Sequence, residues 1–125
     1  MLSIKKIKDN KTISALTNNF KLANDTKYLY MGAVSDNSVV EFIQYEICND
    51  KLIIVYVSDI SGDFSILDGL FKSLLFACDT AKIKSVVLPD KYPLLAKDIG
   101  FEKMSGGYVL SIENYSNKCS CGRKE

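Results

Sequence analysis

The side chains available for proton transfer limit the chemistry open to this 125-residue chain. It contains no histidine, which excludes Ser-His-Asp and Cys-His nucleophile pairs and every metal site that needs a histidine ligand. Any proton that moves must use a carboxylate, a lysine, a tyrosine, a cysteine or water. With 15 acidic residues, 7 tyrosines and 4 cysteines, the chemistry depends on which of them the fold brings into one cleft.

The four cysteines do not form a pattern typical of a metal site or a disulfide framework. Cys48 and Cys78 lie in strongly apolar segments and are expected in the core, whereas Cys119 and Cys121 lie in a polar C-terminal segment. A lone Cys-x-Cys supplies two ligands where zinc needs four, so we expect no metal site. A third, minor hypothesis is that this segment binds a soft metal or forms a redox pair, because adjacent basic residues lower the pKa of a thiol.

Apolar spacing in the first half of the chain predicts a short strand, a helix and three further strands. Residues 2–8 place apolar residues at 2, 4 and 7 among lysines, which predicts a short edge strand, and residues 12–20 place apolar residues three and four apart, as a helix does. Asn10 or Thr12 is the expected N-cap. The apolar runs 28–34, 39–48 and 52–57 are separated by turn dipeptides and predict an antiparallel meander. The last run does not alternate and is expected at the centre of the sheet.

The second half of the chain predicts a helical crossover to a parallel strand. After a polar loop, apolar residues recur at helical spacing as far as Cys78. The stripe consists of Leu67, Leu70, Phe71, Leu74, Leu75 and Cys78. Residues 85–88 predict a short buried strand, parallel to 52–57 because a helix connects the two. Residues 92–99 predict a short helix with Pro93 in its first turn and Gly100 just past its end, and 108–112 predict a final strand.

Length, composition and charge set the class of protein. A chain that is 47% hydrophobic and 25% charged fits one α/β (α+β) domain, expected over residues 1–115, with a flexible Cys-containing tail over 116–125. The net charge of +1 disfavours nucleic acid as a partner. No apolar run approaches the roughly 20 residues of a membrane span and no apolar block follows the N-terminal lysines. We therefore expect no membrane association and a reducing, cytoplasmic location.

The order of these elements resembles the GNAT superfamily of acyl-CoA-dependent N-acyltransferases. The resemblance covers roughly residues 28–112. It is clearest in the apolar strand with its following loop and helix, and in Leu-Leu-Ala-Lys-Asp-Ile-Gly-Phe at 94–101, which is similar to the Leu-Tyr-x-x-x-Gly-Phe ending of that family. It implies a mixed central sheet flanked by helices. It also implies acetyl-CoA as co-substrate, bound in the splay between strands 52–57 and 85–88.

The resemblance places the CoA pyrophosphate at the loop before the long helix. In the family this loop resembles Arg/Gln-x-x-Gly-x-Gly/Ala, because small residues let backbone N–H groups approach the phosphates at a helix N-terminus. The matching positions here are Gly62, Ser65 and Leu67, and Asp63 adds a negative charge beside the phosphates. Backbone amides of this loop can still hold a phosphate. The alternative is a purely structural turn from strand to helix.

The family's acid and base imply candidates for proton transfer. A tyrosine four residues before the Gly of Gly-Phe often protonates the departing thiolate, and Ala96 stands at that position. Tyr92 is the nearest phenol and is either the acid or a packing side chain. The base is frequently a Glu on the meander, so Glu41 and Glu46 are candidates, of which only one can face the cleft because odd spacing on a strand puts them on opposite faces. The alternative is that both are exposed sheet charges.

Two functions are compatible with the resemblance. The first is an N-acetyltransferase that moves an acetyl group from acetyl-CoA to an amine on a small molecule or a peptide, with backbone N–H groups near the end of the central strand polarising the thioester carbonyl. The second is a catalytically degenerate GNAT-fold binding or regulatory domain. The acceptor site is either open or completed by a second copy in a homodimer. The residues implied at the co-substrate site are Val55, Val57, Gly62, Asp63, Ser65, Ile66 and Leu67.

Overall fold

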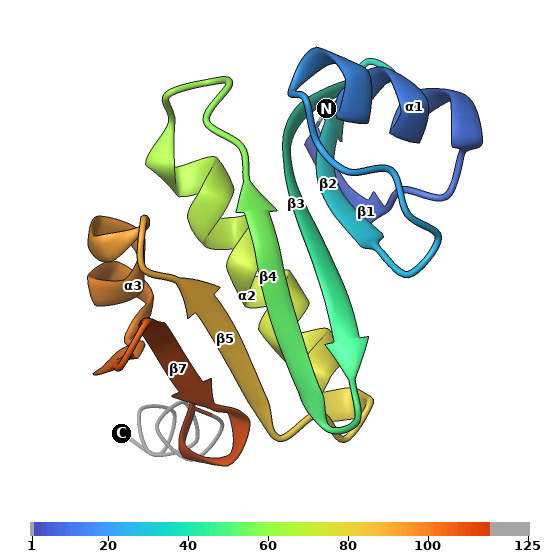
Figure 1. The fold of residues 1–125 in the computed structure, drawn as a ribbon. Helices are drawn as coiled ribbons and strands as arrows, with labels where there is room; N and C mark the ends of the chain where they lie inside the picture. The colour runs from blue at the N-terminus through green and yellow to red at the C-terminus, as the bar shows by residue number, and fades with distance from the viewer. Residues whose placement is uncertain (1, 116–125) are drawn as a thin grey trace.

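The structure is a computed structural model that describes residues 2–115, folded around one seven-stranded sheet (Figure 1). The strand order is β1-β2-β3-β4-β5-β7-β6, and every neighbouring pair is antiparallel except β4 with β5. The strands are β1 (Leu2–Lys6), β2 (Leu29–Ser35), β3 (Ser38–Cys48), β4 (Lys51–Val57), β5 (Ser85–Pro89), β6 (Glu102–Met104) and β7 (Gly107–Ser111). The helices are α1 (Asn10–Asn19), α2 (Phe64–Thr80) and α3 (Pro93–Ile99). The mixed sheet with an antiparallel meander is confirmed.

Two tight turns fix the register of the meander. Asp36 and Asn37 join β2 to β3 and both adopt positive φ, at 50° and 65°, which a two-residue hairpin turn of this kind requires. Asn49 begins the turn from β3 to β4 with φ at 59°. Asparagine and aspartate tolerate this backbone region better than other non-glycine residues, so the turn dipeptides locate the strands.

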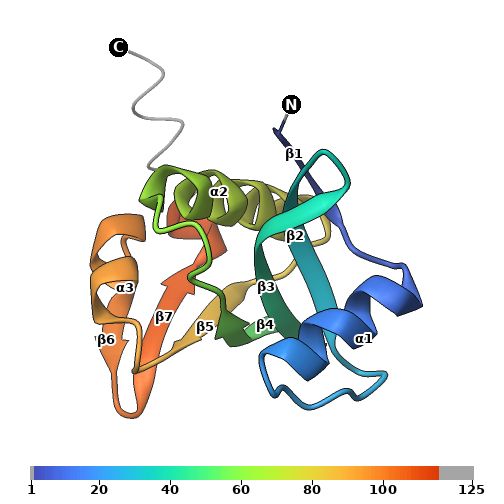
Figure 2. The same cartoon turned by 90° about the horizontal axis from the view of Figure 1, so that it is seen from above.

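Helices α1 and α2 cover opposite faces of the sheet. In Figure 2 α2 lies over one face and α1 under the other. The apolar stripe of α2 packs into the main core, where Leu70, Phe71, Leu74 and Leu75 are at most 1% exposed. A smaller cluster beneath α1 includes Leu16 and Phe42. Because both faces are covered, the central strand β4 has no need of alternating polar residues.

The N-cap of α1 differs from the prediction. Asp9 caps this helix, with its carboxylate accepting the Thr12 N–H at 3.0 Å and the Thr12 hydroxyl at 2.7 Å. The expectation of Asn10 or Thr12 as the cap was wrong by one to three residues, because a charged acceptor was available just before them.

The C-terminal part contains one strand that the sequence did not predict. Gly100 ends α3 in the left-handed region at φ 107°, and its N–H donates to the Ala96 carbonyl at 2.9 Å, as predicted for a residue past the helix end. Residues Glu102–Met104 then form β6, an edge strand exposed along its whole length. A fully exposed strand has no apolar pattern to reveal it.

The two described cysteines lie in contrasting environments. Cys78 is buried on α2, and burial raises the pKa of its thiol to about 11. Cys48 ends β3 and is exposed, so its expected place in the core was wrong. The predicted tail, with Cys119 and Cys121, lies outside the described residues. No helix among residues 2–115 is both long enough and apolar enough to cross a bilayer.

The contrast between the thiols predicts their reactivity. In a variant with Cys119 and Cys121 replaced by serine, Cys48 should react readily with a thiol reagent at pH 8, whereas Cys78 should react at least about a hundredfold more slowly, because little of it is thiolate. Stopped-flow labelling of the native protein measures both rates. Two equally fast phases would contradict the burial of Cys78.

Candidate active site

Strands β4 and β5 separate toward the C-terminal end of β4 (Figure 1). Their parallel pairing runs from Lys51 with Ser85 to Ile53 with Val87, and the rest of β4 has no partner on β5. A cavity of about 580 Å³ lies at this end of β4, bounded by the loop after the strand, the first turn of α2 and residues 91–98. Separated parallel strands leave backbone N–H and C=O groups free to meet a ligand.

β4 carries a bulge beside this cleft. Gln44 pairs with Tyr56 and Tyr45 pairs with Ile54, so Val55 has no partner on β3, and it lies beyond the pairing with β5. Bulges redirect the backbone of a strand and are frequent next to active sites. The structure therefore places Val55 at the bulge, two residues before Val57, which lines the cleft itself.

The phenol of Tyr92 lies against the end of β4. The Val57 N–H donates to Tyr92 Oη at 2.9 Å, which joins residues 35 positions apart in the sequence. Tyr92 is the residue before α3, and its side chain does not cap that helix. A phenol that accepts a hydrogen bond still has its own proton to donate. Tyr92 can therefore offer an acidic proton to a group in the cleft, which it lines.

A lysine at the cleft wall lies over two tyrosine rings. Lys91 Nζ is 5.7 Å from the ring centroid of Tyr56 and 5.4 Å from that of Tyr92, both within cation–π range. Burial raises the pKa of Tyr56, and the neighbouring Tyr92, Glu41 and Asp59 raise it further. Tyr56 therefore stays a neutral phenol at physiological pH, and Lys91 carries the positive charge of this group.

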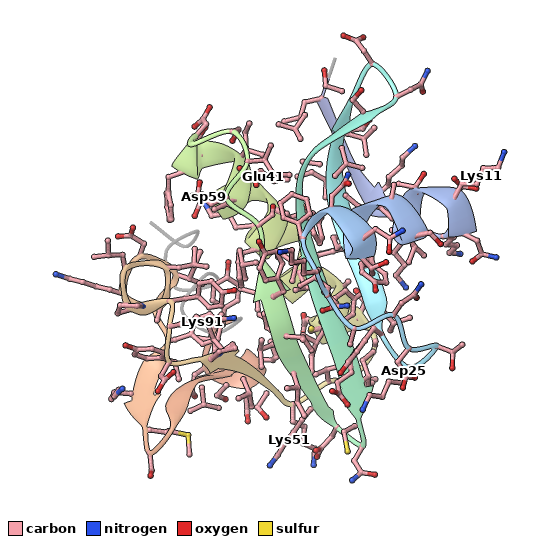
Figure 3. All side chains as sticks on the ribbon, turned by 45° about the horizontal axis from the view of Figure 1, so that its top comes forward. Lys11, Asp25, Glu41, Lys51, Asp59 and Lys91 are labelled. Carbon is pink, nitrogen blue, oxygen red and sulfur yellow. The ribbon has the colours of Figure 1, made fainter. Side chains whose placement is uncertain are left out.

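The carboxylate of Glu41 is fully buried beneath the loop that follows β4 (Figure 3). It accepts hydrogen bonds from the Ser58 hydroxyl at 2.5 Å, the Ser61 hydroxyl at 2.7 Å, and the backbone N–H groups of Ile60 at 3.0 Å and Ser61 at 2.9 Å. Ser58 Oγ in turn accepts the Phe42 N–H at 2.8 Å. The loop is thus folded around one buried negative charge, which these donors satisfy.

This environment makes Glu41 a weak general base. Burial raises the pKa of Glu41, but the hydrogen bonds from Ser58, Ile60 and Ser61 together outweigh burial and hold the pKa below its ordinary value. Each carboxylate oxygen also accepts at least two hydrogen bonds. The geometry favours a positioning role for Glu41 over proton abstraction, and the alternative of an exposed sheet charge is wrong for this residue.

Glu46, the second candidate base, does not line the cleft. It pairs with Ile53, in the part of β4 that is still paired with β5. At about 3.3 Å per residue, roughly 13 Å of strand separates that pair from Val57. A carboxylate that does line the cleft is that of Asp59, which the sequence did not single out.

The residues implied at the phosphate loop divide into two groups. Gly62, Asp63 and Leu67 line the cleft, whereas Ser65 and Ile66 do not. Gly62 adopts a positive φ of 72°, and a side chain there would meet open space. Asp63 is the N-cap of α2, with its carboxylate accepting the Ser65 N–H at 3.0 Å and the Ser65 hydroxyl at 2.6 Å. The half-buried Leu67 packs against the core and also borders the cleft.

Sequence reasoning missed three contributors to this site: Asp59, Lys91 and the serine pair Ser58 and Ser61. The hydroxyls had a usable signal, because a glutamate inside an apolar strand must find donors, and a loop rich in serine follows the neighbouring strand. Lys91 carried no such signal. Among residues 2–115 no three His, Cys, Asp or Glu side chains come together as metal ligands would.

Solved structures share this architecture, although no protein-family model and no curated protein matches the sequence. An acetyltransferase of the GNAT family from Staphylococcus aureus Mu50 superposes with a TM-score of 0.65 and 13% identity, covering 90% of this chain and 99% of that one. The ribosomal-protein-S18-alanine N-acetyltransferase from Escherichia coli gives 0.68 and 12%, covering 90% and 94%. A candidate N-acetyl transferase from Escherichia coli, YhhK, solved in solution with coenzyme A bound, gives 0.67 and 11%, covering 89% and 98%.

The chain has the GNAT fold. Nearly the whole length of each neighbour is matched, so the shared architecture extends beyond the meander to the helical crossover. At 8–14% identity the likeness establishes the fold alone. The resemblance on which the predicted architecture rested is confirmed for the fold.

The Glu41 network predicts a pH-dependent loss of stability. Glu41→Gln should lower the free energy of unfolding at pH 7 by about 2 kcal/mol, because the amide nitrogen cannot accept the loop's N–H and O–H groups. A carboxylate with a lowered folded-state pKa stabilises the fold above its unfolded pKa and loses that contribution as pH falls through the folded value. The difference between parent and variant should therefore shrink below about pH 4.

Urea unfolding at pH 7 and pH 3 measures this difference, with Glu46→Gln, the same change on the same strand, as the matched control. The control should change stability by less than about 0.5 kcal/mol at both pH values. Equal effects of the two substitutions at pH 7 would show that the loop does not depend on Glu41.

Proposed function

We propose that the chain is an N-acetyltransferase that moves an acetyl group from a CoA-type thioester to an amine. The observation that carries the proposal is the meeting of the Val57 N–H and the Tyr92 phenol at the opening between β4 and β5. Its support is twofold: the cleft supplies a backbone donor and an acidic proton at one place, and the neighbouring structures that share the fold are acetyltransferases.

The reaction needs no covalent enzyme intermediate. The neutral amine attacks the thioester carbonyl carbon, a C–N bond forms, and the C–S bond breaks with its electron pair leaving on sulfur. The sulfur then takes a proton to become a thiol, and the nitrogen loses one to become an amide. The protein therefore has to stabilise a developing oxyanion, provide one proton and accept one proton.

Residues of the cleft divide these tasks. In the structure the Val57 N–H donates to Tyr92 Oη. When the thioester binds, its carbonyl oxygen accepts this N–H in place of Tyr92, and the phenol is then free to protonate the departing sulfur. Asp59 at the cleft wall accepts the amine proton, directly or through water. Glu41 takes no proton and holds the loop that carries Asp59. Two predictions stand for the acceptor: its amine belongs to a small molecule or a peptide, and its site is either open or completed by a second copy in a homodimer.

Acetyl transfer to a panel of small amines and lysine- or N-terminal-amine peptides, followed by mass spectrometry, tests the proposal. An acetylated product that depends on protein and thioester is expected. Absence of product from every acceptor, with the thioester bound, would contradict acetyl transfer and support the degenerate binding domain.

Tyr92→Phe should separate the role of the phenol from that of the ring. Loss of the hydroxyl should lower kcat by roughly 10²-fold, as removal of a general acid does, with a stability loss of about 1 kcal/mol from the missing hydrogen bond to Val57. Steady-state rates and thermal unfolding measure the two effects. Tyr108→Phe, which removes a phenol outside the cleft, is the control and should leave kcat within about twofold. Unchanged turnover in Tyr92→Phe would exclude this phenol as the acid.

A further inference from the structure

The loop that should hold the phosphates of a nucleotide already binds two carboxylates of the protein itself. Glu41 accepts the N–H groups of Ile60 and Ser61 from below, and Asp63 accepts the N–H of Ser65 at the start of α2. The hydroxyls of Ser58, Ser61 and Ser65 donate to the same two carboxylates. A phosphate would need these donors, so it would have to displace charges that are already satisfied.

Few backbone amides are left over. The Asp63 N–H donates to Ser61 Oγ at 3.1 Å, and the Ile66 N–H donates to the Asp63 carbonyl at 3.2 Å. Between Ile60 and Ile66, within the described part of the chain, only the N–H groups of Gly62 and Phe64 have no acceptor. Two amides are a small donor set for a pyrophosphate, which carries several oxygens to be satisfied.

The charge of the cleft also opposes a nucleotide. Its lining includes the carboxylates of Asp59, Asp63 and Asp98 against the single ammonium of Lys91. Lys91 lies over Tyr56 and Tyr92, beside the end of β4. The positive charge is therefore placed with the reacting groups and not with the loop at the start of α2.

The remaining surface of the cleft suits an uncharged arm. Phe64, Leu67, Pro93, Leu94 and Leu95 line it, and Leu94 is 78% exposed. A pantetheine chain has apolar methylene and dimethyl groups with two amides, and it carries no charge. Apolar walls and the free polar groups of the separated strand match those features.

From these contacts we propose that the chain recognises its acyl donor through the acyl-pantetheine arm, and that the nucleotide half of CoA contributes little to binding. This inference rests on the proposed acetyl transfer and names its donor class: pantetheine thioesters, with or without a nucleotide attached. The phosphate-loop residues implied by the family resemblance then act as a structural strand-to-helix turn, and the donor set does not fit a pyrophosphate.

Isothermal titration of the parent protein with CoA and with pantetheine, each at about 50 and 300 mM salt, tests the inference without requiring turnover. The two Kd values should agree within about tenfold, and CoA should not bind more weakly at the higher salt, because salt screens the repulsion between its phosphates and Asp63. CoA binding more than tenfold tighter than pantetheine would overturn the inference and leave acetyl transfer standing. Binding of neither compound would overturn both the donor class and the thioester cleft.

Asp63→Asn gives an independent readout, because asparagine caps a helix about as well as aspartate and the variant should fold. Removal of this charge should tighten CoA binding by about tenfold at low salt and leave pantetheine binding unchanged. Asp79→Asn, the same change near the opposite end of α2, is the control and should alter neither affinity. Unchanged CoA affinity in Asp63→Asn would contradict the inference that the Asp63 carboxylate repels the phosphates of CoA.

Discussion

A single buried carboxylate determines the geometry of this protein's cleft. Glu41 is wholly removed from water, and a charge in that position is tolerable only when hydrogen-bond donors surround it. The donors come from one short loop, which must therefore fold back over β3 directly after β4 ends. This loop conformation sets where α2 begins and holds the wall of the cleft against the strand.

The separation of β4 from β5 gives the second constraint. The two strands pair over three residues and then diverge. Helix α2 connects them and packs its apolar stripe on one face of the sheet. Beyond the last β4–β5 pair, the Val57 N–H donates to Tyr92, and β4 departs from regular pairing with β3 at Val55. Of the groups to which the proposed acyl transfer assigns a role, the Val57 amide belongs to the sheet, which fixes its position in the cleft.

The sequence predicted the elements of this fold well because their signals are local. The unbroken apolar run of β4 and the apolar stripe of α2 each follow from burial on one or two faces. The exposed strand β6 lacks any such pattern, and it was missed. The cap Asp9 and the exposed Cys48 show that boundaries and strand ends are less predictable than the elements themselves.

The site was less predictable because its contacts join distant parts of the chain. Glu41 meets donors 17 and 20 residues away, and Tyr92 meets an amide 35 residues away, so neither partner can be read from spacing. The family resemblance located the cleft, yet it implied a proton-accepting role for Glu41 that the filled carboxylate oxygens do not favour. Side-chain chemistry on a shared fold therefore has to be argued from the contacts themselves.

The proposed function requires the gap at Val57 and Tyr92 to bind a thioester. An amide chemical-shift titration of the ¹⁵N-labelled protein with S-acetylpantetheine tests it most directly, because the Val57 N–H must change its acceptor when the thioester oxygen binds. We expect the largest shifts on Val57, Gly62 and Phe64, while the amides of β1 and α1 stay unchanged. Saturable shifts confined to another part of the molecule, or a Val57 signal that does not move at saturation, would contradict it.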